Sequence, residues 1–288
     1  MDCATSAMVQ TRLYPTGGHL STVFGLHREE NPASLPGRWG NYPRWVVFSG
    51  IRVILFNNET KGGIPMKRTR LADRRLPSYS RGEEIMNMVT HIVGGALGVV
   101  ALVLCVIRAA GRGNLYGVIA SVIYGVSMIA LYTMSSVYHG LRPGMAKKVM
   151  QVIDHCTIYF LISGSYTPFA LSAIRPVYPA LGWGLFTFEW ALTALAVTMT
   201  AIDLKKYNVF SMICYIGLGW AIIPFAGIVI ETVTFTGFLL VLSGGIAYTI
   251  GAVLYGIGSK KPWMHSVFHI FVVLGSLLQF FSIYFFAL

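Results

Sequence analysis

Seven apolar stretches follow one another through the C-terminal part of the chain, and each is 21 to 25 residues long. A helix of that length, at 1.5 Å per residue, crosses the roughly 30 Å hydrocarbon layer of a bilayer. Only 11% of the residues are charged, whereas a soluble domain carries about 25%. The pattern predicts an all-α membrane protein with seven transmembrane helices, at 86–107, 115–139, 151–172, 181–201, 209–229, 233–257 and 265–288.

The N-terminal part differs in composition: residues 1–82 mix Gly, Pro and Arg with short apolar pieces and hold 12 of the 22 Lys and Arg residues. We expect a basic, largely disordered extension there, followed by the membrane domain at 83–288. Residues 1–65 can also form a small amphipathic element at the membrane surface, and the sequence leaves that alternative open. A formal net charge of +11 beside apolar spans fits anionic lipid, so no nucleic-acid partner is expected.

The loops between the stretches alternate in basic charge. One alternate set carries seven Lys and Arg residues and the other carries three, and the basic N-terminal stretch adjoins the richer set. Loops rich in Lys and Arg stay on the cytoplasmic side of a membrane. The sequence therefore predicts a multi-pass membrane protein with a cytoplasmic N-terminus and an extracytoplasmic C-terminus.

Few ionisable side chains interrupt the stretches, and histidines are prominent among those at the predicted cytoplasmic helix ends. A charge near the bilayer centre costs about 2.5–3.5 kcal/mol, so such a group usually has a partner or a function. His265 and His269 stand four residues apart on one helix face, a spacing that lets two imidazoles bind one ion. His139 and Asp154 come from two other helices at the same predicted depth.

Three imidazoles and a carboxylate that ligates the ion or holds a water form the open tetrahedral arrangement of catalytic zinc. We therefore predict a zinc site at His139, His265, His269 and Asp154. Ser135 shares a helix face with His139, and we expect it to hold the water or stabilise an oxyanion. The alternatives are a histidine cluster that only joins three helices, and a serine that bonds the carbonyl of its own preceding turn.

Two further features bear on this site. Glu84, Asn87 and His91 form one stripe on the first helix, which either supports the metal ligands or is an interfacial polar face. His155 follows Asp154 directly and so points about 100° away from it. We therefore exclude His155 from the ligands.

Four segments carry a family resemblance: EEIMNMVTH (83–91), SSVYH (135–139), DHCTIYFLISGSYTPF (154–169) and HSVFH (265–269). Together they resemble the bacterial hemolysin III family, within the progestin and adipoQ receptor superfamily, over roughly residues 80–288. The resemblance implies a seven-helix fold with a cytoplasmic N-terminus and a multi-pass location in the bacterial cytoplasmic (inner) membrane. It also implies a zinc ion surrounded by five residues, here Ser135, His139, Asp154, His265 and His269.

The members of this superfamily differ in activity. Eukaryotic relatives are hormone receptors, and adiponectin receptors and alkaline ceramidases resemble lipid-amide hydrolases. The resemblance therefore leads us to expect a zinc-dependent hydrolase of a lipid amide or ester, with a membrane lipid as substrate or ligand. Two alternatives stay open: a pore-forming, cytolytic membrane protein, as the family name suggests, and a lipid sensor or receptor with a structural zinc.

Overall fold

The computed structural model describes residues 9–16, 19–26, 45–48, 51–54, 68–258 and 261–288. The chain divides into two compact units, Met1–Pro65 and Met66–Leu288. The sequence prediction placed the domain boundary at residue 82, whereas the structure groups residues 66–82 with the helices.

Two β-hairpins lie in the first unit. Strand β1 (Val9–Thr16) pairs antiparallel with β2 (His19–Leu26), and β3 (Trp45–Phe48) pairs antiparallel with β4 (Ile51–Ile54). All four strands are rich in β-branched and aromatic residues, which favour the extended backbone. The composition of the segment as a whole did not predict them, and the expectation of a largely disordered extension stays a prediction.

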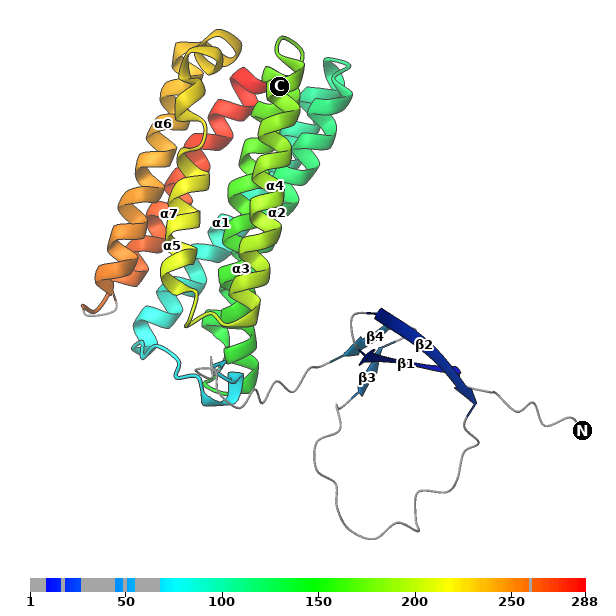
Figure 1. Ribbon diagram of the computed structural model, residues 1–288. Coiled ribbons are helices and arrows are strands. Elements are labelled where there is room, and N and C mark those ends of the chain that lie inside the picture. The colour runs from blue at the N-terminus through cyan, green and yellow to red at the C-terminus, as the bar shows by residue number, and fades with distance from the viewer. Residues whose placement is uncertain (1–8, 17–18, 27–44, 49–50, 55–67, 259–260) are drawn as a thin grey trace, which may run out of the picture. The chain divides into compact units, whose positions relative to one another are not determined.

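The second unit is helical. Its described part holds seven α-helices: α1 (Arg81–Gly111), α2 (Leu115–Gly140), α3 (Met145–Pro168), α4 (Pro179–Ile202), α5 (Asn208–Trp220), α6 (Ala226–Gly258) and α7 (Met264–Ser282). Shorter helical turns add to them: η2 (Leu71–Asp73), η3 (Phe169–Ile174), η4 (Ile223–Phe225) and η5 (Ile283–Ala287). The long helices stand side by side and alternate in direction, as Figure 1 shows. The predicted all-helical membrane domain is therefore present in this unit.

Six helical segments of the described residues are long and apolar enough to cross a membrane. Five correspond to single predicted stretches, whereas the sixth, Asn208–Gly258, is 51 residues long and combines α5, η4 and α6. Its backbone leaves the helical conformation at Thr234, where φ is 64° and ψ is 165°. The count of seven crossings and the orientation of the termini stay predictions.

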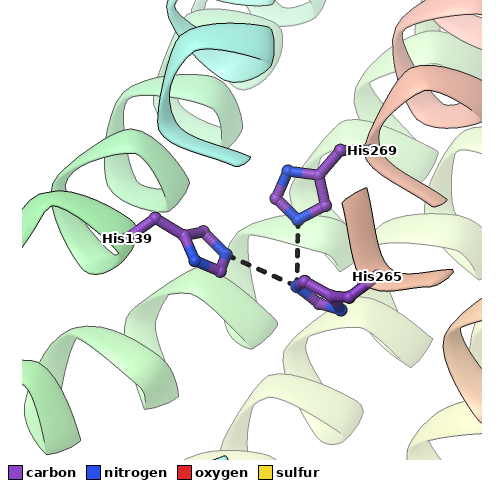
Figure 2. Close-up of side chains that lie close together, drawn as sticks. All are labelled: His139, His265 and His269. Carbon is purple, nitrogen blue, oxygen red and sulfur yellow. Dashed lines mark hydrogen bonds between the residues drawn. The ribbon is translucent and has the colours of Figure 1, made fainter. Parts of the chain in front are cut away.

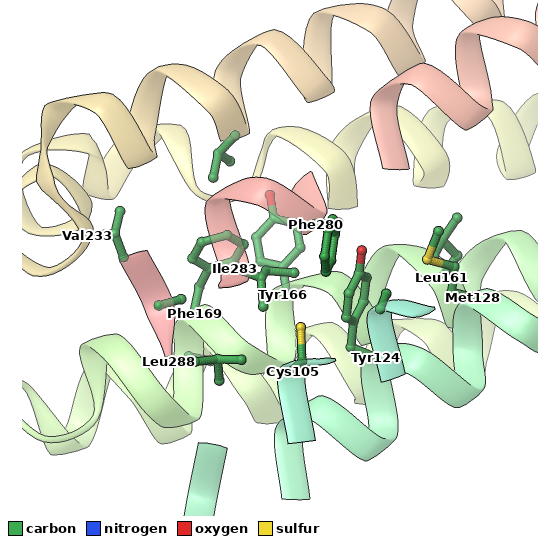
Figure 3. Close-up of a cluster of buried hydrophobic side chains, with 14 of the residues drawn as sticks. Cys105, Tyr124, Met128, Leu161, Tyr166, Phe169, Val233, Phe280, Ile283 and Leu288 are labelled. Carbon is green, nitrogen blue, oxygen red and sulfur yellow. The ribbon is translucent and has the colours of Figure 1, made fainter. Parts of the chain in front are cut away.

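Small residues let the first three helices approach closely. A Cβ atom on Gly125 of α2 would lie 2.5 Å from the Leu102 side chain of α1, and one on Gly164 of α3 would lie 2.6 Å from the Ser127 hydroxyl. Such contacts are shorter than any real side chain tolerates, so these positions require glycine. Deeper in the bundle, a cluster of buried apolar side chains joins α1, α2, α3, α6 and α7 (Figure 3).

The start of α1 is fixed by local hydrogen bonds. The Ser80 main-chain N–H donates to Glu83 at 2.8 Å, and the Glu83 N–H donates to the Ser80 hydroxyl at 3.3 Å, which forms a capping box. The other Glu83 oxygen accepts from the Trp263 main-chain N–H at 2.7 Å, just before α7. One side chain therefore holds the beginnings of the first and last helices together.

The segment before α1 is bound to the helical unit. The Thr69 N–H donates to Asp203 at 2.7 Å, Arg68 Nε donates to the Ile202 carbonyl at 2.7 Å, and Lys148 Nζ donates to the Ala72 carbonyl at 2.5 Å. These bonds explain why residues 66–82 belong with the helices. They also carry the chain to the end of the bundle where α1, α3 and α7 begin and α2 ends (Figure 1).

Candidate metal centre

Three imidazole rings converge at this end of the bundle. His139 comes from the last turn of α2, and His265 and His269 come from the first turns of α7. The Nε2 atoms of His139 and His265 are 3.4 Å apart, and those of His265 and His269 are 3.1 Å apart (Figure 2). All three residues are buried, and their ligand atoms lie within 4.8 Å of one another. The separation of four residues places both α7 imidazoles on the face that meets His139.

The imidazole of His139 is held from behind by α1. A Glu84 carboxylate oxygen lies 2.7 Å from His139 Nδ1, and the Asn87 amide lies 3.4 Å from the same nitrogen. Because a carboxylate only accepts hydrogen bonds, Nδ1 carries the ring proton and Nε2 presents its lone pair to the cluster. The second Glu84 oxygen accepts from Lys147 Nζ at 2.7 Å, and that ammonium also donates to the Leu141 carbonyl at 3.0 Å. A carboxylate behind an imidazole is the usual support of a metal-binding histidine.

Two more rings cover the α7 histidines. His91 stacks on His269 with ring centroids 3.7 Å apart, and Tyr79 stacks on His265 with centroids 4.8 Å apart. Burial raises the pKa of Tyr79, so its phenol stays neutral at physiological pH. The stripe of Glu84, Asn87 and His91 therefore contacts the histidine cluster, and the interpretation of that stripe as support for the site agrees with its position.

Asp154 and Ser135 lie beside the cluster. Both line one cavity together with His265 and His269. The Ser135 side chain lies near the Asp154 carboxylate. Asp154 does not belong to the compact group that the three imidazoles form among the described residues. Its predicted role, as a ligand or as the holder of a water, stays a prediction.

His155 has other partners. Its Nδ1 lies 2.8 Å from the Gln151 carbonyl oxygen, and its Nε2 lies 3.3 Å from the Tyr255 hydroxyl. Both ring nitrogens therefore face groups outside the three-histidine cluster. This placement agrees with leaving His155 out of the ligand set.

The cavity has a volume of about 120 Å³ and extends away from the histidines between α3, α5, α6 and α7. Its walls are mostly apolar, with side chains such as Leu161, Ile162, Met212, Ile216 and Val272. A polar cluster at one end of an apolar chamber suits an amphiphile whose reactive group meets the cluster.

Sequence reasoning did not find two residues of the site. Lys147 was counted only as a loop charge for the orientation, yet it is 2% exposed and bonded to Glu84. Tyr79 precedes the first apolar stretch and showed no pattern of its own. One sequence feature could have placed Lys147 near the site: it stands only eight residues after His139, across a short turn.

The donor set fits a transition-metal ion. Three facing Nε2 atoms bring lone pairs together, which is unfavourable unless a proton or a cation lies between them. Imidazole nitrogens suit zinc, copper, iron and nickel, and three of them with an open fourth position are typical of catalytic zinc. The group can therefore bind a metal ion, as the sequence predicted.

Fold and site together define a multi-pass helical membrane protein with a buried histidine cluster that opens into an apolar cavity. Residues 79–280 match the sequence profile described as Haemolysin-III related. The chain belongs to that family. The resemblance seen in the four motifs is thereby confirmed.

Individual relatives extend this result. The chain is 37% identical over 206 residues to Hemolysin-3 of Bacillus cereus, an alignment that covers 72% of this chain and 92% of that protein. It is 35% identical over 204 residues to a Hemolysin-3 homolog of Bacillus subtilis (strain 168), covering 71% and 94% of the two chains. It is 26% identical over 171 residues to the human Monocyte to macrophage differentiation factor, covering 56% and 68%. The mammalian match supports the wider adipoQ receptor superfamily.

Proposed function

We propose that the protein is a zinc-dependent hydrolase of a lipid amide or ester in the bacterial cytoplasmic membrane. The observation that carries this proposal is the convergence of three Nε2 atoms at the polar end of an apolar cavity. In this proposal an acyl chain enters the apolar part of the cavity, and its carbonyl group lies near the imidazoles and Asp154. A lipid of the surrounding membrane is then the substrate or ligand.

The residues divide the chemistry among them. His139, His265 and His269 would hold a zinc ion, which would supply Lewis acidity and a water of pKa near 7. Asp154 accepts the proton of the attacking water at its carboxylate and passes it to the leaving group. Ser135 donates a hydrogen bond that keeps this carboxylate in position. The Glu84 carboxylate fixes the tautomer and direction of His139.

We also propose seven crossings, with the N-terminus in the cytoplasm. At 1.5 Å per residue the 51-residue segment would be about 77 Å long, far beyond one bilayer, and its backbone breaks at Thr234. Residues 208–233 and 235–258 are then two crossings, which supports seven in all. A reporter enzyme that works only outside the cytoplasm, fused after Leu288, is expected to be active. Activity of a cytoplasmic reporter at the same position would contradict an odd number of membrane crossings.

The proposed reaction is tested with Asp154→Asn in proteoliposomes. The variant keeps the side-chain volume and can still hydrogen-bond a water, but it cannot accept a proton. Because general-base assistance contributes roughly 10²–10⁴ in rate, lipid turnover is expected to fall by that factor while zinc content stays constant. Ceramides and simple phospholipids serve as substrates, products are measured by mass spectrometry, and zinc is measured on the same samples.

Three other outcomes would contradict the hydrolase. Undiminished turnover in zinc-loaded Asp154→Asn would refute the role of that carboxylate. No turnover in the zinc-loaded wild type, together with reduced thermal stability after zinc removal, would favour a sensor with a structural metal. Ion conductance that survives the substitution while the lipids stay intact would favour a pore, in keeping with the name Hemolysin-3 of the Bacillus cereus relative.

A further inference from the structure

The cavity has a second polar feature, far from the histidines. Gln279 lies ten residues after His269 on α7 and lines the same chamber. It is 7% exposed, and its Oε1 is buried without a hydrogen-bond partner among the described residues. Leaving a buried amide unpaired costs about 1–3 kcal/mol, so such a group in a cavity wall needs an explanation.

The other polar groups around Gln279 are already paired. Trp220 Nε1 donates to Thr249 Oγ1 at 3.0 Å, and Tyr166 OH donates to the Gly219 carbonyl at 2.8 Å. Tyr248 shares a hydrogen bond of 2.8 Å with Ser276. These side chains of the cavity wall are therefore already hydrogen-bonded to other groups of the protein. Among the described side chains that line this end of the cavity, the Gln279 amide is therefore the one with an oxygen that has no hydrogen-bond partner.

The distance from the histidines defines what that molecule would be. Ten residues of helix rise by about 15 Å. A carbon–carbon bond of about 1.5 Å advances an extended chain by about 1.3 Å, so Gln279 lies roughly twelve carbons from the metal site. An apolar chain that carries a hydroxyl at that point would satisfy the amide and keep the rest of the cavity filled.

We infer that Gln279 is a specificity subsite for an acyl chain that carries a hydroxyl near its middle. This inference rests on the proposed function, because it takes the cavity to hold an acyl chain with its carbonyl at the histidines. An amide both donates and accepts, and a hydroxyl does the same, so the two groups match in either orientation. A site that pairs with a hydroxyl discriminates against the analogue that lacks it, since the buried amide is then left unpaired.

The test compares fatty acids that differ only in the hydroxyl. Radiolabelled stearate is bound to the purified full-length protein in dodecyl maltoside and displaced by unlabelled stearate, 12-hydroxystearate or 2-hydroxystearate. The 12-hydroxy acid is expected to bind about three- to tenfold more tightly than stearate, which corresponds to one neutral hydrogen bond. The measurement is repeated after metal removal, where the same preference is expected because Gln279 lies far from the metal.

Two variants test whether Gln279 causes the preference for 12-hydroxystearate. Gln279→Met keeps an unbranched side chain of similar volume and is expected to bring the ratio of the two affinities to about one. Val272→Ala is the matched control: Val272 lines the same cavity on the same helix, so its loss weakens the binding of both acids alike and preserves the ratio.

The outcomes separate this inference from the proposed function. Equal binding of stearate and 12-hydroxystearate by the wild type, or a preference that survives in Gln279→Met, would overturn the subsite and leave the acyl cavity in place. A preference for 2-hydroxystearate alone would also overturn it, since that hydroxyl lies at the metal end. Failure of stearate itself to bind would overturn the acyl cavity, and the proposed function with it.

Discussion

The two ends of the helical bundle differ in how their polar groups are paired. At the histidine end, nitrogen atoms of the same kind face one another across 3.1–3.4 Å. At the other end, donors meet acceptors: Asn114 Nδ2 donates to Ser172 Oγ at 2.8 Å, which donates to the Ala287 carbonyl at 2.6 Å, and Arg112 donates to the Leu288 carbonyl.

The difference shows what each end is for. The Ser172 end pairs these polar atoms within the chain and thereby holds η5 against η3 and the turn between α1 and α2. The histidine end instead brings three imidazoles close enough to bind one cation. Substitutions at the histidine end should therefore change metal affinity, and substitutions at the Ser172 end should change stability alone.

Loss of a histidine should produce the largest effect. His265→Ala or His269→Ala each removes one of three imidazoles and is expected to abolish most metal binding. Metal content of the purified protein, measured by plasma mass spectrometry, checks this. His155→Ala is the control, because both of its ring nitrogens face other groups, and it should keep its metal. Equal loss in all three variants would mean that the ligands are wrongly assigned.

Removal of the carboxylate behind His139 should have the next largest effect. Glu84→Gln weakens the contact that directs Nε2 into the cluster, and such supporting residues typically contribute 10–100-fold to metal affinity. Competition with a chelator of known affinity measures the change. Glu231→Gln, which alters a carboxylate bonded to Tyr178 in the exposed part of the molecule, should leave the affinity unchanged. An unchanged affinity in Glu84→Gln would remove this residue from the site.

At the opposite end, Ser172→Ala should reduce stability without changing metal content. It leaves the Asn114 amide and the Ala287 carbonyl without their partner, at a cost of about 1–3 kcal/mol. Thermal unfolding in detergent, with and without chelator, should show the same decrease under both conditions. Thr198→Ala is a suitable control, since this exposed hydroxyl bonds only the Ala194 carbonyl of its own helix. A decrease that depends on metal would contradict the separation of the two ends.

The smallest effect concerns Asp203, which anchors the segment before α1. Burial alone would raise the pKa of this carboxyl, but main-chain N–H groups of Thr69, Lys206 and Lys205 outweigh burial and hold the pKa below its ordinary value. A lowered pKa stabilises the fold above the unfolded value of about 3.9, and this contribution is lost as the pH falls through the folded value. The stability difference between wild type and Asp203→Asn should therefore be constant from neutral pH to about pH 5 and should shrink below about pH 4. Unfolding temperatures measured across that range check it, and a constant difference would contradict it.

The sequence predicted those features that arise from spacing along one helix. Hydropathy located the apolar stretches, and the separation of four residues identified His265 and His269 as a pair. His139 and Asp154 could be added because short loops bring alternate helix ends to one side of the membrane.

Features that depend on contacts between distant segments could not be predicted in the same way. The burial of Lys147 follows from Glu84, which lies 63 residues earlier. The cavity exists because α3, α5, α6 and α7 surround a space that no local sequence pattern reveals. The Gln279 amide oxygen lacks a partner while the groups around it are paired with one another, and no sequence pattern shows that pairing.

The bond from the Trp263 main chain to Glu83 has a consequence for biosynthesis. It joins residues 180 positions apart, and the His139 cluster likewise needs two residues of α7. A chain emerges from the ribosome N-terminus first. While the last helix is still being made, the nascent protein holds only one of the three imidazoles. Its Glu83 side chain also lacks the Trp263 N–H group that joins the first and last helices. The cluster therefore forms last, and a chain interrupted before residue 265 is inserted in the membrane without it.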